Sequence, residues 1–336
     1  MDVISLPVYS WGCAAGFAIR MASRLTGRNE VLVAKTAGPE RLGAIISLCG
    51  HPSMPGHINV DIVGFASNNG LLDIDALKSK ISSRTAAVYF ENPSYLGCIE
   101  SQGSTISRLA HENGAVTIVG VDPISLGVLC PPPDYGADIV VGTLQSLGVH
   151  MQCGGGVAGF IASRDEEDYV AEYPTTMESI LTTMQEGEFA FGHCAFERTS
   201  YVKRDKAKDF YGTTSTLWAI SAAVYMALMG PQGFREIGEL IIQRSKYAAK
   251  LLAEISGIKI LLSNNSFKEF VVNFNDTGKN VKDINKALLA HKIFGGKDIS
   301  SEFPELGNSA LYCVTEIHSQ DDIEKLADAL KEVVSQ

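Results

Sequence analysis

The 336-residue sequence lacks several features that would assign it to other classes of protein. Its longest apolar run, Leu217–Met229, is too short to cross a bilayer, and no basic segment followed by an apolar one resembles a secretory signal. Positive charge is also scarce, because 28 lysines and arginines stand against 38 aspartates and glutamates, a formal net charge of −10. These absences argue against a membrane protein and against nucleic acid or an anionic membrane as the main partner.

Cysteine pairs are missing as well. The seven cysteines are scattered, odd in number and never spaced as Cys-x-x-Cys, and no histidine spacing is typical of a metal site. Several of them lie in apolar runs, where a thiol behaves as a small hydrophobic group. We therefore expect a protein of the reducing cytoplasm, without a disulfide framework and without a metal.

Strand-like and helical patterns alternate through the first two thirds of the chain. Alternation of this kind predicts an α/β fold with a mainly parallel sheet and right-handed crossovers. The expected strands are Val31–Ala34, Ile58–Val63, Ala86–Phe90, Ala115–Val121, Asp138–Val141 and Val157–Ala162, and the expected helices are Gly16–Leu25, Ile74–Ile81, Ser104–Asn113 and a short one at Glu166–Tyr169.

The last third of the chain has a different organisation. From Thr214 to about Ile255 the pattern is helical, with a break at Gly230-Pro231. The remainder predicts a small α+β domain with strands Lys259–Leu262, Glu269–Phe274 and Ala310–Val314 and helices Val281–His291 and Asp321–Val334. We therefore expect a large α/β domain over residues 1–213, linking helices over 214–255 and a small domain over 256–336.

A lysine is missing where the order of elements would place one. Asp122 follows the strand-like run that ends at Val121, where ligands bind in open α/β sheets, and in enzymes that use pyridoxal phosphate (PLP) such an aspartate pairs with the pyridine nitrogen. Gln145 then stands where a Schiff-base lysine is expected, yet no lysine occurs between Lys80 and Lys203. Glutamine can donate and accept hydrogen bonds but cannot form an imine. The alternatives are that Asp122 merely begins a turn and that Gln145 is an ordinary loop residue.

Other candidate sites are weaker. The string Gly154–Gly159 satisfies G-x-G-x-x-G but precedes a strand, whereas a dinucleotide-binding loop precedes a helix. Ser10–Gly16 could place a phosphate at a helix N-terminus. His150, near the proposed pocket, could shuttle a proton. The basic window Arg198–Lys208 is interpreted first as a solvated charged helix, and His193-Cys194 as structural.

Several phrases together resemble the α-type subunit (subunit 1) of the two-subunit glycine decarboxylases, the P-proteins of the glycine cleavage system. The resemblance is collinear over essentially the whole chain. The phrases that carry it are Asn92-Pro93 with Gly97–Glu100, Val121–Gly127, Tyr135–Gly142, Gln145–Gly148, Arg204–Ala207, Ala222–Tyr225, Gly230–Gly233, Glu269–Val272 and Cys313–Glu316.

This resemblance implies PLP fold type I and a heterotetramer of two subunit types. It implies that a lysine-bearing subunit 2 holds PLP, that glycine is decarboxylated, and that the aminomethyl group passes to the lipoyl carrier (H) protein. The present chain would then contribute no covalently bound cofactor. Asp122 and Gln145 would line a vestigial pocket, with His150 as a weak catalytic candidate.

The sequence also departs from the family pattern. The family's N-terminal segment is absent before Met1, so we expect a shortened chain or one whose apolar start is covered by another chain. The chain also carries residues that are unusual in the family at three places, Cys13, Glu91 and Asp209–Thr213. An alternative hypothesis is therefore a catalytically silent scaffold subunit, and a third, based on Gly154–Gly159, is an independent dehydrogenase.

Overall fold

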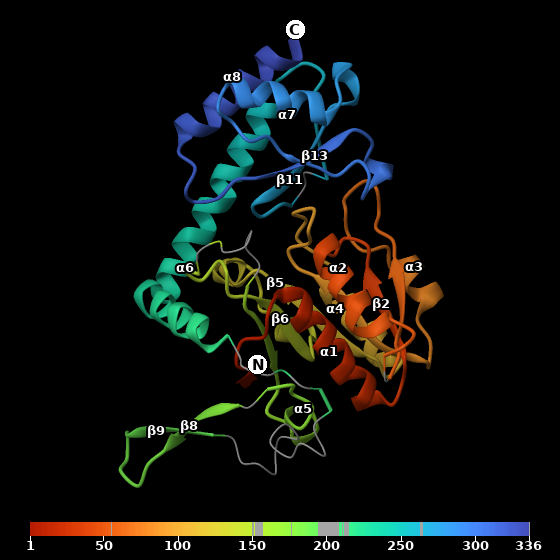
Figure 1. The fold of residues 1–336 in the computed structure, drawn as a ribbon, viewed down its shortest axis with the longest axis vertical. Helices are drawn as coiled ribbons and strands as arrows, with labels where there is room; N and C mark the ends of the chain where they lie inside the picture. Colours follow the sequence, from red (N-terminus) through yellow and green to blue (C-terminus); the bar gives the residue numbers. More distant parts are fainter. Residues whose placement is uncertain are drawn as a thin grey trace.

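The computed structural model describes residues 1–54, 56–149, 151, 157–175, 177–193, 208–209, 211, 215–262 and 265–335. Within these residues no helix has the length and the hydropathy needed to cross a bilayer. Two sheets dominate the molecule, a large one at the base of Figure 1 and a small one above it, and helix α6 (Thr216–Ala253) runs from one to the other.

The large sheet has seven strands in the order β1-β7-β6-β5-β4-β2-β3. The five strands from β6 to β3 are parallel, as expected from the alternating pattern. Their interior members are buried on both faces, which explains why they read as continuous apolar runs. The strands are β1 (Val3–Ile4), β2 (Glu30–Ala34), β3 (Asn59–Val63), β4 (Thr85–Glu91), β5 (Val116–Val121), β6 (Ile139–Thr143) and β7 (Gly159–Ser163).

Strand β7 departs from the expectation of parallel strands. It pairs antiparallel with β6, with Ile139 opposite Ser163, and β1 pairs antiparallel with β7 in turn. A parallel neighbour needs a crossover, usually helical, and the described residues of the β6–β7 connection carry no helix. The chain therefore returns along the edge of β6.

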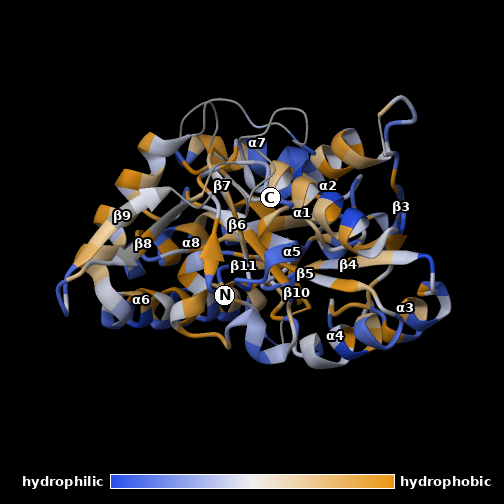
Figure 2. Ribbon diagram, turned by 90° about the horizontal axis from the view of Figure 1, so that it is seen from below, coloured by the Kyte–Doolittle hydropathy of each residue, from blue (hydrophilic) through white to orange (hydrophobic). Residues whose placement is uncertain are grey.

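Helices cover both faces of the large sheet. One face packs on α1 (Trp11–Thr26), whose core side chains include Ala14, Ala18 and Met21, and the other packs on α3 (Ile74–Lys80), α4 (Gly103–Glu112) and part of α6. Both α3 and α4 carry hydrophilic and hydrophobic residues, as expected for helices with one face on the sheet (Figure 2). The short helices α2 (Pro39–Ile45) and α5 (Glu167–Val170), the π-helical turn Ile46–Gly50, and a hairpin of β8 (Glu178–Thr182) and β9 (Phe189–His193) complete this part.

The small sheet is antiparallel, in the order β10-β11-β13-β12. Helix α6 bends at Gly230, whose backbone is not helical (φ 57°, ψ 179°), directly before Pro231, as the Gly-Pro pair predicts. The elements of this part are β10 (Lys259–Leu261), β11 (Glu269–Asn273), β12 (Lys297–Asp298), β13 (Ser309–Cys313), α7 (Val281–Ala290) and α8 (Gln320–Ser335).

Main-chain contacts join the two sheets. Cys98 and Ser266 form an isolated antiparallel bridge, the amide of Phe267 donates to the carbonyl of Gly97 (3.1 Å), and that of Ile99 donates to the carbonyl of Asn265 (2.8 Å). This pairing places the start of β11 against the carboxyl ends of the large sheet's strands.

Candidate functional site

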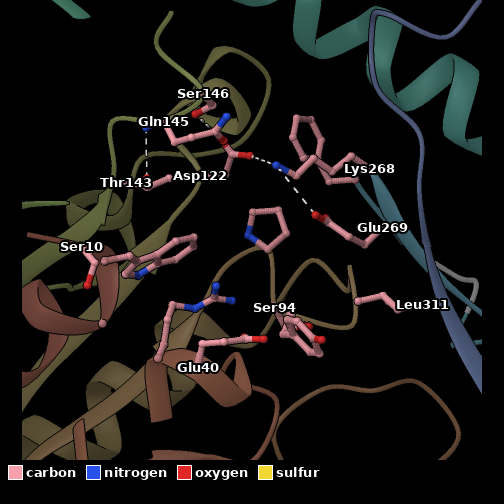
Figure 3. Close-up of a pocket in the computed structure, with 16 residues that line it drawn as sticks. Ser10, Glu40, Ser94, Asp122, Thr143, Gln145, Ser146, Lys268, Glu269 and Leu311 are labelled. Atoms are coloured by element: carbon pink, nitrogen blue, oxygen red, sulfur yellow. Dashed lines mark hydrogen bonds and ion pairs between the residues drawn. The ribbon is translucent and has the colours of Figure 1, made fainter. Parts of the chain in front are cut away.

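A cavity of about 540 Å³ lies where the carboxyl ends of the parallel strands meet the start of β11. Figure 3 shows its lining side chains converging from both parts of the molecule. The residues that line it are Ser10, Trp11, Gly12, Glu40, Arg41, Pro93, Ser94, Tyr95, Asp122, Thr143, Gln145, Ser146, Phe267, Lys268, Glu269 and Leu311. This position is the usual ligand site of an open α/β sheet.

Asp122 comes directly after β5 and is almost completely buried, with 6% of its surface exposed. One carboxylate oxygen accepts hydrogen bonds from the amide of Ile124 (3.0 Å) and the hydroxyl of Ser146 (3.1 Å). The other oxygen forms an ion pair with the ammonium of Lys268. Burial opposes the charge, but these partners, Lys268 first among them, hold the pKa of Asp122 below its usual value. Both oxygens of the carboxylate are therefore in use.

Lys268 enters the cavity from the small sheet, directly before β11. Its ammonium contacts Asp122 and lies 3.8 Å from a carboxylate oxygen of Glu269 (Figure 3). Burial alone would lower the pKa of this lysine, but Glu269 and Asp122 raise it above its usual value. Lys268 is therefore a fixed ammonium that neutralises the buried carboxylate of Asp122.

Gln145 follows β6 and lines the same cavity. The backbone amide of Gln145 donates a hydrogen bond to the hydroxyl of Thr143 (3.1 Å). The side chain of Gln145 lies beside Asp122 in Figure 3. The two residues that the sequence pattern singled out are thus brought together, although 23 positions separate them.

Glu91 and Arg41 form a second charged pair at the cavity. The Glu91 side chain is fully buried at the end of β4, and both its oxygens accept hydrogen bonds from the Arg41 guanidinium, at 2.6 and 2.7 Å. Tyr89 and the amide of Gly38 also donate to this carboxylate, at 2.9 and 3.2 Å. The guanidinium lies 4.1 Å from the centre of the Trp11 ring, a cation–π contact. Glu91 is thus a fully satisfied buried carboxylate.

The residues of this cavity do not fit a covalently held PLP. An imine requires an uncharged lysine amine, whereas Gln145 has no amine and Lys268 is held as an ammonium. In fold type I enzymes a protonated pyridine nitrogen pairs with the carboxylate at this position, whereas the charge of Asp122 is already paired with the ammonium of Lys268 within the chain.

The other sequence candidates have mixed outcomes. Several candidates lie outside the described residues, namely His150, Gly154–Gly156, Cys194 and most of the basic window. Gly159 begins strand β7 rather than a helix, which is the wrong order for a dinucleotide-binding loop. Ser10 caps helix α1 by accepting a hydrogen bond from the amide of Cys13 (3.2 Å). Lys208, from the basic window, pairs with the buried Glu172.

The sequence patterns gave no indication of Lys268, Arg41 or Glu269 as cavity residues. Lys268 is 146 positions from Asp122, and the phrase Glu269–Val272 that follows it supported the resemblance without indicating a cavity residue. Arg41 lies in α2, a seven-residue helix that the periodicity did not indicate. One feature of the sequence could have indicated a buried site here: a lysine and a glutamate stand side by side at the start of a buried strand. Charged residues are rarely buried without a partner.

The fold, with a ligand cavity at the carboxyl edge of its sheet, is that of the fold type I PLP-dependent transferases. A solved structure of a glycine decarboxylase (P-protein) in inhibitor-bound form superposes with a TM-score of 0.87 at 29% identity, over 99% of this chain and 72% of that one. A sphingosine-1-phosphate lyase from Burkholderia pseudomallei superposes with a TM-score of 0.69 at 15% identity, over 99% and 69% of the two chains, which supports the fold alone.

Sequence comparison then identifies the family. The model of the glycine cleavage system P-protein matches residues 1–330. A probable glycine dehydrogenase (decarboxylating) subunit 1 from Staphylothermus marinus is 35% identical over 100% of this chain and 71% of its own length. The corresponding protein from Thermococcus onnurineus is 33% identical over 99% and 72%. The chain therefore belongs to the glycine cleavage system P-protein family.

Proposed function

We propose that this chain is the α-type, non-lysine subunit of a glycine decarboxylase in the glycine cleavage system. A lysine-bearing subunit 2 holds PLP, glycine is decarboxylated there, and the aminomethyl group passes to the lipoyl carrier protein. The observation that carries the proposal is the cavity itself: Gln145, where the sequence pattern predicts an imine-forming lysine, lines it, and the lysine that does line it, Lys268, is paired with Asp122. We further propose the division into residues 1–213, 214–255 and 256–336.

The chain's contribution is then support of the partner rather than covalent chemistry. Buried, internally neutralised charges give it a rigid cavity wall, and positioning and exclusion of water are what a neighbouring subunit can add to a reaction. The five cysteines among the described residues carry free thiols, which fits a reducing cytoplasm.

A row of exposed apolar side chains on α6 supports docking of the partner. Four of them recur at helical spacing before the bend at Gly230, so they lie on one face. Their exposed fractions are 67% for Leu217, 58% for Ile220, 56% for Val224 and 80% for Leu228. Contiguous apolar surface of this kind marks an interaction site, and we assign it to subunit 2.

The docking face can be tested by one substitution with a matched control. Leu228→Glu should leave the free energy of unfolding of the isolated chain within about 0.5 kcal/mol, because the side chain already faces solvent. It should weaken co-purification with subunit 2 at least tenfold. Leu289→Glu, on an exposed position of α7 (54%), is the control that should leave assembly intact. Equal assembly of both variants would remove this face from the proposal.

The proposed function is tested by glycine–CO2 exchange. The isolated chain should show no exchange, and activity should appear when the lysine-bearing subunit and the lipoyl carrier protein are added. Full exchange by the isolated chain would overturn the proposal. Mass analysis after borohydride treatment with PLP provides an independent readout, since no single lysine of this chain should carry a stoichiometric adduct.

The second candidate is a catalytically silent scaffold. One observation favours it: Glu91, a departure from the family pattern, serves the fold by pairing with Arg41. A subunit 2 that is equally active with and without this chain would favour the scaffold, whereas dependence of the exchange rate on this chain would favour the first proposal.

A further inference from the structure

The ammonium of Lys268 pairs with the carboxylate that the order of elements assigns to a charged pyridine nitrogen. In an enzyme that carries PLP, the aspartate after this strand pairs with the protonated ring nitrogen. Here the same carboxylate, on Asp122, is paired with a cation that the chain itself supplies. The Lys268 side chain has 24% of its surface exposed and that of Asp122 has 8%, so the pair is largely removed from water.

The backbone fixes the position of Lys268. On one side of it, the amide of Phe267 donates to the carbonyl of Gly97, and the carbonyl of Phe267 accepts a hydrogen bond from Ser245 (2.6 Å). The carbonyl of Lys268 itself accepts from the amide of Val314 (2.9 Å) in the small sheet. The ammonium is therefore directed at Asp122 by the fold and is not delivered by a free loop.

The surroundings of Lys268 keep it charged. Glu269 and Asp122 both lie against the ammonium and raise the pKa of this lysine above its usual value. An ammonium has no lone pair with which to attack a carbonyl group. This arrangement separates Lys268 from an imine-forming lysine, although it is a lysine in the cavity.

We propose that Lys268 is an internal counter-ion that closes this cavity to pyridine cofactors by engaging Asp122. Two changes, and not one, then separate this cavity from one that carries PLP: the glutamine at position 145 and the lysine at position 268. Restoring a lysine at position 145 alone is therefore not expected to restore binding. The inference rests on the proposed function in one respect, namely that this chain does not hold PLP covalently.

The experiment uses pyridoxamine 5′-phosphate as the probe, because its amine cannot form an imine with lysines and it reports only on the cavity. Equilibrium dialysis should show no saturable binding by the wild-type chain and at least tenfold tighter binding by Lys268→Met. The combined variant Lys268→Met with Asp122→Asn should lose the gain, because the probe's ring nitrogen then has no carboxylate. Lys259→Met, at a lysine outside the cavity lining that pairs with Asp276 (2.6 Å), is the matched control and should gain nothing.

Saturable binding by the wild-type chain, or no gain in a folded Lys268→Met chain, would overturn the inference.

If Lys268→Met does not fold, amine acetylation of the native chain provides the test. Lys268 should be modified at least tenfold more slowly than Lys78, whose side chain is 54% exposed, and equal rates would overturn the inference. The two failures are distinguishable. Binding of the probe by the wild-type chain overturns this inference and leaves partner-dependent exchange intact, whereas exchange by the isolated chain overturns the proposed function and with it the premise of this inference.

Discussion

Two buried ion pairs contribute side chains to the same cavity but connect different parts of the chain. The pair of Glu91 with Arg41 lies within the large-sheet part and joins positions 50 residues apart. The pair of Asp122 with Lys268 crosses from the large sheet to the small one and joins positions 146 residues apart. Glu91 is fully buried with four donors, whereas Lys268 keeps contact with solvent. The first pair therefore stabilises one wall of the cavity, and the second holds two walls together and sets which ligands can enter.

The largest effect is expected at the more deeply buried pair. Arg41→Met leaves the Glu91 carboxylate without its cation, and breaking a buried pair in this way costs about 3–5 kcal/mol. Glu91→Gln should lower the free energy of unfolding by only about 1 kcal/mol. The charge left without its partner is then on Arg41, whose side chain is 20% exposed and can be hydrated. Urea unfolding of the two variants measures the difference. Equal losses would show that Glu91 is not the uncompensated group.

A smaller loss is expected when the pair that joins the sheets is broken. Lys268→Met leaves Asp122 with the hydrogen bonds from Ile124 and Ser146, so the cost should be about 2 kcal/mol. Adding Asp122→Asn should recover part of it, because position 122 then carries no uncompensated charge. Chemical unfolding of the single and double variants tests this, and a double variant less stable than Lys268→Met would contradict the assignment.

The smallest and most specific effect is on the pH dependence of stability. The folded-state pKa of Asp122 lies below the ordinary 3.8, so its contribution is present above about pH 4 and is lost as the pH falls towards the folded value. The pKa of Lys268 lies above the ordinary 10.5, so its contribution is complete below that pH and is lost only as the pH rises through the folded value. Glu269 has the opposite effect on stability at acid pH. Burial raises its pKa in the folded state, so protonation of this carboxyl group favours the folded state as the pH falls.

The measurement is the free energy of unfolding between pH 3 and pH 7. One group contributes a slope of at most about 1.4 kcal/mol per pH unit. Asp122→Asn should have a shallower acid limb than the wild type while keeping Glu269. An unchanged acid limb would mean that Asp122 does not titrate with folding.

The sequence predicted the repetitive parts of this molecule and missed what depends on contacts between distant residues. Strands such as β4 and β5 were found because burial on both faces leaves uninterrupted apolar runs. The elements missed were short or at an edge, such as β1 with two residues and α2 with seven. The antiparallel direction of β7 was missed because strand patterns carry no direction.

The sequence likewise predicted only part of the site. Asp122 and Gln145 were recognised because each follows a strand of the same sheet, whose carboxyl ends lie along one edge. Lys268 was missed because it lies far outside the segment between Lys80 and Lys203, where the order of elements predicts a cofactor-binding lysine. Its place in the cavity depends on how the small sheet docks, and no local pattern encodes that.

The contact at Gly97 limits how this subunit can move. A Cβ atom at this position would lie 1.9 Å from the carbonyl oxygen of Glu269, so the two main chains touch with no side chain between them. A hinge is a short segment whose backbone dihedral angles can change freely, whereas here main-chain hydrogen bonds and the Asp122–Lys268 pair hold the junction. We therefore expect the chain to behave as the stationary half of its complex, against which any opening and closing would be performed by the other subunit.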